Sequence, residues 1–366
     1  MQFKQIIGQT NTKRYLMESA QHDHISHAQL FLGNEGCGAL SLALAFAQYV
    51  NCSNRQTDDS CGRCSNCKKS QKLIHPDIHY CYPTIGSKAK STDLLTEWRE
   101  AVLKNPYMNV FQWLQHLKAD NKQGNITAEE CEDIIRKLSF TTYEAPYKIL
   151  LLWMPEYLGK EGNRLLKIIE EPPPNTLFLL VAENANLVLN TILSRTQLLR
   201  IPRISETEIQ EYLQEKFGLN PNFAQQIAIL SEGNYNEALN LMANANHDNQ
   251  QLLVRWLTIL VEKQTQNLPA LVDQLAEMGR EAQKHFLRYS LHFLRQCLLK
   301  QHLPQHHLAI STPEKELAQQ LLQNNQRSQF ELLYQLINDS FYHIERNANP
   351  RILFFNLSIK VGDNLK

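Results

Sequence analysis

The sequence has no excess of charge of either sign, because 37 Lys and Arg residues are balanced by 37 Asp and Glu residues. A strongly basic chain would attract nucleic acid or an anionic membrane over its whole surface, and this balance argues against a stand-alone DNA-binding protein. The sequence also lacks any apolar run near the roughly 20 residues of a membrane-spanning helix. Its first five residues, Met-Gln-Phe-Lys-Gln, do not begin an apolar signal segment. We therefore expect a cytoplasmic protein with no membrane partner.

A phosphate-binding loop is present without its lysine. Residues 33–40 read Gly-Asn-Glu-Gly-Cys-Gly-Ala-Leu, between a strand expected at 28–32 and a helix expected at 40–50. The pattern G-x-x-x-x-G-K-[ST] uses its Lys to reach the phosphates and its hydroxyl to hold Mg²⁺, whereas this chain has Ala39 and Leu40 there. We expect the fold of an ATPase without the means to hydrolyse ATP. The glycines of this vestigial phosphate loop, its candidate cofactor-binding residues, are Gly33, Gly36 and Gly38.

The acidic residue that helps P-loop enzymes to hold Mg²⁺ at the end of a second strand is missing as well. The apolar run 148–153, which is typical of a buried parallel strand, leads into Met154 and Pro155. Glu156 follows, but a single carboxylate is a poor substitute there and can serve instead to cap the next helix. Two independent elements of catalysis are therefore absent, which argues against a variant active loop.

The order of secondary structure changes along the chain. Expected strands at 28–32, 148–153, 177–182 and 197–201 alternate with helices, and only helical patterns follow the last of them. This order predicts a parallel α/β domain followed by all-α parts. Residues 84–124 carry no strand pattern, and we interpret them as a helical insertion of unassigned function.

Four of the eight cysteines form a cluster with the spacing C-x₈-C-x₂-C-x₂-C. Four thiolates suit a tetrahedral zinc ion, and a site made only of Cys leaves no open position for catalysis. Structural zinc would order a loop that has almost no core of its own, since zinc supplies roughly 10–16 kcal/mol to small modules. The alternative is a redox-active or incidental cluster. The candidate metal ligands are Cys52, Cys61, Cys64 and Cys67.

Several short segments occur in a fixed order along the chain: Ile-Ile-Gly-Gln at 6–9, residues 27–33, the four-Cys module at 52–67, His-Pro-Asp at 75–77, residues 163–173 and Ser-Arg-Thr at 194–196. Taken together, they resemble the clamp-loader subunits of bacterial DNA polymerase III, which are AAA+ proteins. The resemblance spans about residues 1–245. That family has catalytic members with intact phosphate loops and a delta-prime subunit with a degenerate one, and the loop of this chain is similar to the degenerate kind.

The resemblance implies a role in ATP-driven loading of the sliding clamp onto primed DNA. The implied direct partners are gamma/tau-like ATPase subunits and a delta-like subunit. The sliding clamp and primer-template DNA are implied partners through the complex. Zinc is then a structural cofactor, and ATP is not hydrolysed by this chain.

The resemblance also assigns roles to single residues. From the residues alone, Arg195 is either an ordinary surface cation or an arginine that acts on a neighbouring nucleotide site. The family motif Ser-Arg-Cys maps onto Ser194, Arg195 and Thr196, which implies that Arg195 is an arginine finger acting in trans. Asn236 stands where the catalytic members carry a nucleotide-sensing Arg in their lid, so a third element for nucleotide is missing.

These expectations define three regions and leave two rival functions. The expected regions are an AAA+ RecA-like α/β domain at 1–204, with the zinc module at 52–67 and the helical insertion at about 84–124, then a helical lid at 205–246 and a helical collar or oligomerisation domain at 247–366. The rivals are a zinc-containing DNA-binding module and an atypical P-loop ATPase. Basic residues near the four cysteines either contact DNA phosphates or, as we expect, form a solvated basic face. Tight, salt-sensitive DNA binding would indicate the DNA-binding module, and nucleotide turnover by this chain alone would indicate the ATPase.

Overall fold

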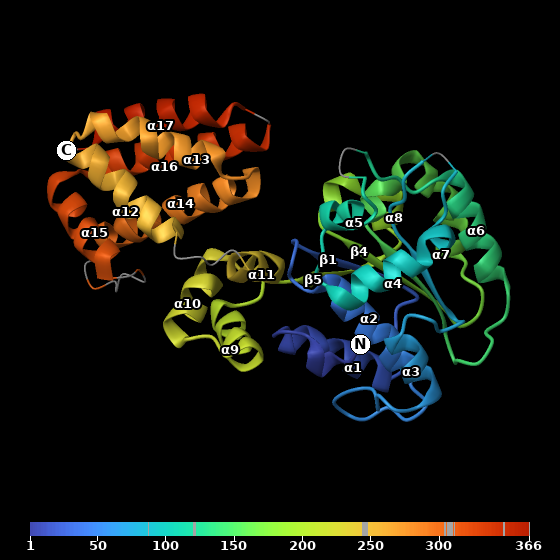
Figure 1. The fold of residues 1–366 in the computed structure, drawn as a ribbon. Coiled ribbons are helices and arrows are strands. Elements are labelled where there is room, and N and C mark those ends of the chain that lie inside the picture. The colour runs from blue at the N-terminus through green and yellow to red at the C-terminus, as the bar shows by residue number, and fades with distance from the viewer. Residues whose placement is uncertain are drawn as a thin grey trace. The chain divides into compact units, whose positions relative to one another are not determined.

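Figure 1 shows the fold as a computed structural model, in which the chain forms two compact units. The first unit consists of Met1–Ala224 with Ser231–Ala238, and the second of Gln225–Leu230 with Leu239–Lys366. The structure describes residues 1–365 except 87, 120–121, 244–247, 304, 306–309, 311 and 347. The expected boundary at residue 246 lies outside the described residues.

The first unit is built on a five-stranded sheet with the order β2-β3-β4-β1-β5. All of its strand pairs are parallel. Every residue of β3 and β4 is buried, which explains why the two strands appear in the sequence as uninterrupted apolar runs. The predicted parallel α/β fold class is therefore confirmed. The strands are β1 (Ala28–Gly33), β2 (Ile78–Cys81), β3 (Lys148–Trp153), β4 (Thr176–Ala182) and β5 (Gln197–Ile201).

Helices cover both faces of the sheet (Figure 1). Alternate strand residues point to opposite sides, so Leu151 belongs to the core under α2, whereas Leu152 belongs to the core under α6. The helices of this unit are α1 (Thr10–Gln21), α2 (Ala39–Val50), α3 (Ser65–Gln71), α4 (Leu95–Lys104), α5 (Val110–His116), α6 (Ala128–Ser139), α7 (Leu166–Glu170), α8 (Asn190–Leu193) and α9 (Glu206–Phe217), with 3₁₀ helices η1 (Phe3–Gln5), η2 (Ser91–Leu94), η3 (Pro155–Leu165) and η4 (Ala185–Leu187). Two further helices, α10 (Pro221–Leu230) and α11 (Tyr235–Ala243), pass from one unit into the other.

The segment 84–124 packs into the first unit through aromatic side chains. Trp98 of α4 stacks on Tyr82 with ring centroids 4.1 Å apart and also contacts Trp153 at the end of β3. Trp113 of α5 meets Trp98 edge to face at 5.4 Å. Both tryptophans are fully buried, so the segment is fixed beside the carboxyl end of β3.

The second unit is helical and has a core of its own. Trp256 is fully buried, contacts Phe286 with ring centroids 5.7 Å apart, and donates its indole N–H to Ser358 Oγ at 2.9 Å. Phe286 in turn contacts Phe354, so three of the helices meet at these aromatic side chains. The helices are α12 (Asp248–Val261), α13 (Leu268–Glu277), α14 (Arg280–His302), α15 (Thr312–Asn324), α16 (Arg327–Glu345) and α17 (Pro350–Asn364), with the 3₁₀ helix η5 (Thr265–Asn267).

Across the described residues, the helices are too short or too polar to span a membrane.

Candidate functional site

The vestigial phosphate loop, residues 33–38, joins the carboxyl end of β1 to the start of α2. This edge of a parallel sheet is where α/β proteins bind their ligands. Gly36 and Gly38 have φ angles of +69° and +90°, a region that glycine adopts without the cost that other residues incur. Ala39 and Leu40 follow at the first turn of α2, and both are buried. The loop therefore retains the backbone of a phosphate site, while its cationic and hydroxyl side chains are absent.

The space above the loop is almost filled. Its walls include Gly36, Gly38, Trp153 and Glu183, together with residues 106–108 of the insertion. The remaining cavity has a volume of ≈ 20 Å³, which is enough for about one water molecule. Pockets for small ligands measure roughly 300–1,000 Å³, so this cavity by itself is too small to enclose a nucleotide.

Tyr107 is one of the side chains that line this space, and it is buried. Its hydroxyl accepts a hydrogen bond from the Ile7 backbone N–H at 3.0 Å. Its ring lies so close to Gly38 that a Cβ atom there would be 3.0 Å from Tyr107 Cε1. The neighbouring Pro106 carbonyl accepts a hydrogen bond from Ser41 Oγ of α2 at 3.2 Å. The insertion, which had no assigned function, thus covers the phosphate loop.

Glu35 at the tip of the loop binds polar side chains from two other parts of the chain. Its Oε1 accepts a hydrogen bond from Asn109 Nδ2 of the insertion at 3.0 Å. The same atom accepts from Asn234 Nδ2 and Asn236 Nδ2, each at 3.3 Å. Asn236, the expected lid position of a nucleotide-sensing Arg, also accepts a hydrogen bond from Asn105 Nδ2 at 2.9 Å. These four asparagines and Glu35 form what we call the asparagine network.

Glu156, which follows β3, is engaged with the backbone. Its Oε1 accepts hydrogen bonds from the N–H groups of Glu183 and Asn184 at 2.7 and 2.9 Å. Burial raises the pKa of Glu156 above its usual range, against the opposing effect of these N–H groups. The residues that line the cavity include no Lys or Arg. A triphosphate placed here would therefore lack a cationic partner among the described lining residues.

Arg195 lies after α8, in the turn that leads to β5, and does not line the cavity at the phosphate loop. Its Nη1 donates to the Thr191 carbonyl at 3.0 Å and to Ser194 Oγ at 3.3 Å. Its Nε is 3.3 Å from Glu170 Oε2 of α7, and its side chain is 32% exposed. Ser194 Oγ donates to the same Thr191 carbonyl. The structure thus brings Arg195 and Ser194 together and leaves the guanidinium partly open to solvent.

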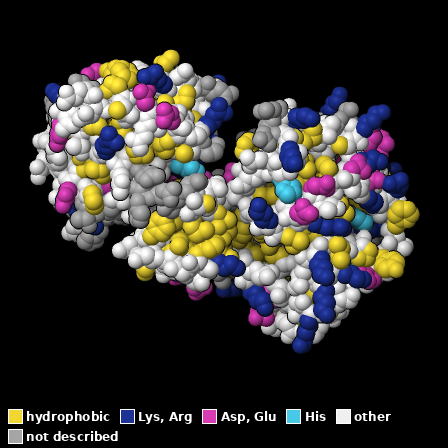
Figure 2. Space-filling model, in the orientation of Figure 1, with side chains coloured by type: hydrophobic (Ala, Val, Ile, Leu, Met, Phe, Trp, Pro, Cys, Tyr) yellow, Lys and Arg dark blue, Asp and Glu magenta, His cyan; other side chains and the backbone are white. Residues whose placement is uncertain are grey.

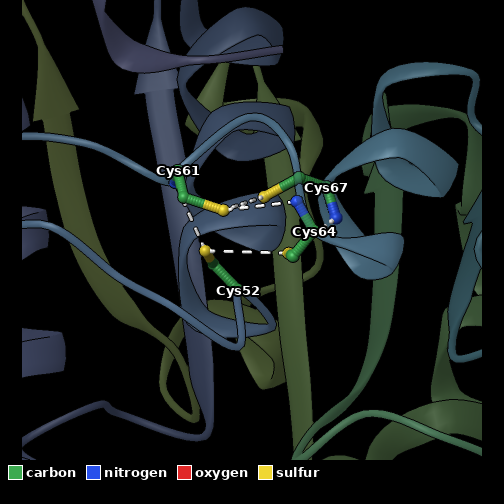
Figure 3. Close-up of side chains that lie close together, drawn as sticks. All are labelled: Cys52, Cys61, Cys64 and Cys67. Carbon is green, nitrogen blue, oxygen red and sulfur yellow. Dashed lines mark hydrogen bonds between the residues drawn. The ribbon is translucent and has the colours of Figure 1, made fainter.

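The four predicted metal ligands lie together between the end of α2 and the first turn of α3, which contains Cys67 (Figure 3). All four Sγ atoms are within 4.8 Å of one another. The Sγ atoms of Cys52 and Cys64 are 4.0 Å apart, and those of Cys61 and Cys67 are 3.9 Å apart. Thiolates bound to one tetrahedral zinc ion at about 2.3 Å are about 3.8 Å from one another. The four side chains therefore fit a single metal ion of this kind.

Backbone N–H groups point at the sulfur atoms of this cluster. Cys61 N–H donates to Cys52 Sγ, Cys64 N–H to Cys61 Sγ, and Cys67 N–H to Cys64 Sγ, at 3.3 to 3.4 Å. Burial would raise the pKa of the Cys64 thiol, but hydrogen bonds from Ser53 and Cys67 outweigh it and lower the pKa to about 6. Such hydrogen bonds favour thiolates and orient metal ligands. These contacts favour the thiolate at Cys64, whereas burial raises the pKa of Cys52 and Cys67.

The four-Cys module, residues 52–67, is fastened to the start of the chain. Asp59 accepts hydrogen bonds from the backbone N–H groups of Phe3 and Lys4 at 3.1 and 3.0 Å. Gln2 Nε2 donates to the Ser60 carbonyl at 2.6 Å. Gly62 has a φ of +69°, and a Cβ atom at this position would be 2.8 Å from Gln2 Oε1. The module therefore stabilises the N-terminal segment.

Basic side chains gather on the part of the first unit that contains this module (Figure 2). The exposed cations of this stretch are Arg55, Arg63, Lys68 and Lys72. They face solvent, and none of them is within the metal cluster.

The sequence profile of the family described as "DNA polymerase III, delta subunit" matches residues 8–205, which is more than half of the chain. The chain belongs to the clamp-loader AAA+ family of DNA polymerase III subunits. It is similar along most of its length to DNA polymerase III subunit gamma of Buchnera aphidicola subsp. Acyrthosiphon pisum. The two are 24% identical over 359 residues, which cover 92% of this chain and 88% of that protein.

This clamp-loader family member is also similar to two proteins named DNA polymerase III subunit delta'. It is 27% identical over 237 residues to that of Bacillus subtilis, covering 64% of this chain and 60% of that protein. It is 30% identical over 191 residues to that of Haemophilus influenzae, covering 52% of this chain and 47% of that protein. The predicted family is therefore confirmed.

Sequence reasoning about this clamp-loader family member missed Tyr107 and the asparagine network. The local signal was Asn105-Pro106-Tyr107-Met108-Asn109, in which a proline between polar residues marks a turn. Nothing in that signal says that the turn folds over a loop about 70 residues earlier in the chain, because only tertiary structure brings the two together.

Proposed function

We propose that this chain is the non-catalytic, delta-prime-type subunit of a DNA polymerase III clamp loader. It assists the ATP-driven loading of the sliding clamp onto primed DNA and donates Arg195 to the ATP site of a neighbouring subunit. Its direct partners are gamma/tau-like ATPase subunits and a delta-like subunit, and the clamp and primer-template DNA meet it through the complex. The observation that carries this proposal is the phosphate loop. Its backbone conformation is retained, but it lacks the Lys and the hydroxyl side chain, and the cavity above it is small.

Three features of the loop support the absence of ATP hydrolysis. Ala39 and Leu40 cannot contact phosphate or Mg²⁺ as Lys and Ser or Thr do. Glu156 uses its carboxylate to accept backbone hydrogen bonds. Tyr107 occupies the space above the loop and leaves a cavity of ≈ 20 Å³. Each feature alone would impair turnover, and together they favour a chain that holds its shape without nucleotide.

The position of Arg195 supports a role in trans. Its guanidinium is partly exposed and lies away from the lining of this chain's own phosphate loop. An arginine supplied by a neighbour is worth about 10³–10⁵ in rate for some phosphoryl transfers, because it stabilises charge in the transition state. Ser194 contributes a hydroxyl beside Nη1, at 3.3 Å, and helps to orient the side chain.

The same proposal includes a structural zinc ion and three regions. Cys52, Cys61, Cys64 and Cys67 hold the zinc ion, which orders the module and the N-terminal segment fastened to it. The regions are the AAA+ RecA-like domain at 1–204, the helical lid at 205–246 and the helical collar or oligomerisation domain at 247–366.

The test is ATP turnover with a loader reconstituted from the organism's other subunits. Arg195→Ala is expected to lower DNA-stimulated hydrolysis at the neighbouring site by about 10³-fold or more, while the complex still assembles on gel filtration. Arg136→Ala is the matched control, because Arg136 is also an exposed arginine in an ion pair, with Asp133. Full activity of Arg195→Ala would refute the finger.

The isolated chain separates the rival functions. We expect no ATP hydrolysis by the chain alone and only weak DNA binding. Turnover by the purified chain, abolished by a change in the loop, would instead support an atypical ATPase. Tight DNA binding that weakens steeply with salt would support a DNA-binding module.

A further inference from the structure

The segment Asn105–Asn109 contacts two parts of the chain that a nucleotide would be expected to join. One is the vestigial phosphate loop with the start of α2, and the other is the lid segment Ser231–Ala238, which belongs to the same compact unit. In catalytic relatives of the kind that the sequence resembles, the lid senses nucleotide through an Arg. This chain has Asn236 in place of that Arg, so other contacts must hold the lid segment.

On the loop side, the segment packs closely. The Tyr107 ring lies against Gly38, Pro106 accepts a hydrogen bond from Ser41, and the Tyr107 hydroxyl accepts one from Ile7. Tyr107 is 7% exposed, and burial raises the pKa of its phenol, which therefore stays protonated. This contact is an ordinary piece of protein core and does not depend on a ligand.

On the lid side, aromatic and amide contacts continue the same structure. The rings of Tyr107 and Tyr235 meet at 66° with centroids 4.8 Å apart, and Tyr235 meets Tyr212 of α9 edge to face at 5.5 Å. Asn105 Nδ2 donates to Asn236 Oδ1 at 2.9 Å. The position expected to sense nucleotide is thus hydrogen-bonded to the insertion.

The phosphate loop contains a carboxylate, that of Glu35. Glu35 carries a negative charge at the tip of the phosphate loop and receives amide N–H groups from Asn109, Asn234 and Asn236. Hydrogen bonds to an ionised acceptor are roughly twice as strong as neutral ones. A carboxylate of the protein therefore gathers donors from the lid segment and from the insertion.

The lid segment also touches the loop backbone directly. Tyr235 N–H donates to the Gly36 carbonyl at 3.1 Å. Asn234 lies so close to Gly36 that a Cβ atom there would be 1.7 Å from Asn234 Oδ1. This bond gives a single backbone amide, that of Tyr235, whose protection from solvent reports whether the lid segment and the loop are joined.

We propose that the segment Asn105–Asn109 is a built-in substitute for nucleotide, which joins the phosphate loop to the lid segment Ser231–Ala238 permanently and independently of ATP. This proposal extends the proposed function by giving the non-catalytic subunit a fixed lid conformation. The contacts of the segment do not involve Arg195, so an experiment that refutes the arginine finger does not refute this proposal.

The test is hydrogen–deuterium exchange on the full chain, read by mass spectrometry at residues 231–238. In the unmodified chain these amides are protected, and saturating ATP with Mg²⁺ leaves their exchange unchanged. Tyr107→Ala is expected to speed their exchange by about tenfold or more, since local exchange follows the opening equilibrium of the segment. Tyr107→Phe retains the ring contacts and is expected to behave nearly as the unmodified chain. Phe111→Ala, at a 52% exposed position in the same insertion, is the matched control and is expected to have no effect.

A second variant guards against a general loss of folding. The double change Asn105→Ala with Asn109→Ala removes two bonds of the asparagine network and retains the Tyr107 ring, although it also removes the Tyr107 N–H bond to Asn105 and the Asn109 cap of α5. The exchange of the β3 amides reports whether the first unit as a whole stays folded. If Tyr107→Ala also speeds exchange in β3, the exchange of residues 231–238 in the double variant is the test of the proposal. Variants are compared only if their β3 amides stay protected, which shows that the unit is folded. The proposal is overturned if residues 231–238 stay fully protected from exchange in both the double variant and Tyr107→Ala under this condition. It is equally overturned if ATP slows their exchange in the unmodified chain.

Discussion

Arg195 Nε lies 3.3 Å from Glu170 Oε2, which joins the turn before β5 to the end of α7. Glu170 is 59% exposed and Arg195 is 32% exposed, and exposed ion pairs of this kind contribute about 0–1 kcal/mol. The pair is therefore weak enough that, under the proposed function, the guanidinium can leave Glu170 for a phosphate group. Under the proposed function, Glu170 pairs with Arg195 when Arg195 is not bound at the neighbouring ATP site.

Glu170→Gln tests this relationship in the reconstituted loader. Removal of the carboxylate charge leaves Arg195 without a competing anion, so we expect DNA-stimulated ATP hydrolysis to stay equal or to rise by up to about fivefold, the factor that corresponds to about 1 kcal/mol. Steady-state turnover at saturating ATP measures the effect, with Glu171→Gln as the adjacent control. A fall as deep as that of Arg195→Ala would instead place Glu170 within the working site.

Zinc content tests the four-Cys module. The purified chain is expected to carry one zinc ion, and Cys67→Ser to lose it, since Cys67 is a fully buried member of the cluster. Without the metal the module has little core, so backbone exchange should also rise at Phe3 and Lys4, whose N–H groups bind Asp59. Atomic emission and hydrogen exchange measure the two effects.

The control for zinc content is Cys37→Ala, because Cys37 is a buried cysteine outside the module. It should retain zinc and leave exchange at the N-terminal segment unchanged. Zinc that persists after Cys67→Ser, or a chain that folds normally with no metal at all, would contradict the structural assignment.

Asp77 gives a prediction about acid stability. Burial opposes its ionisation, but backbone N–H groups of Tyr143, Glu144 and Ala145 donate to its carboxylate and lower its pKa below the ordinary value of 3.8. A depressed pKa means that the ionised form stabilises the fold above the unfolded-state pKa, and that this stability is lost as the pH falls through the folded-state pKa. Asp77→Asn should therefore lower the free energy of unfolding at neutral pH by about 1.5–3 kcal/mol.

Urea unfolding at neutral and acidic pH measures this effect. The difference between the unmodified chain and Asp77→Asn should shrink as the pH falls below 3.8, where the wild-type carboxyl becomes neutral too. Asp58→Asn, at an exposed position, is the control and should change the stability by less than about 0.5 kcal/mol. A difference that is constant with pH would show that the charge of Asp77 has no part in it.

Local patterns predicted the parts of the fold whose burial is continuous. The apolar run 148–153 predicted β3 with the bounds that the structure has. In contrast, β2 (Ile78–Cys81) was missed, because four residues that include a His and a Tyr carry no clear period. Its strand conformation comes from pairing with β3, in which Ile78 lies opposite Ile149 and Cys81 opposite Leu152. Such pairing is a property of the folded chain.

The same contrast holds at the candidate site. The candidate metal ligands follow from spacing alone, since the four cysteines are close in the sequence and their Sγ atoms lie within 4.8 Å of one another. The loss of phosphate chemistry at Ala39 also follows from the sequence. The occupation of the pocket by Tyr107 does not, because it depends on where α4 and α5 are fixed by Trp98 and Trp113. Side chains that act through distant contacts were the ones that sequence reasoning could not supply.

The filled pocket predicts that catalytic residues alone will not restore nucleotide binding. Ala39→Lys with Leu40→Thr rebuilds the G-K-[ST] sequence, but Tyr107 still lies against Gly38 and leaves a cavity of ≈ 20 Å³. We expect no ATP binding by this double variant in isothermal titration calorimetry, and measurable binding only when Tyr107→Gly is added to open the space. Tyr107→Gly without the loop changes is the control and should not bind, since the cation for the phosphates is still missing. Binding of ATP by the double variant with Tyr107 in place would mean that the insertion moves aside easily, and that Tyr107 does not exclude nucleotide from this site.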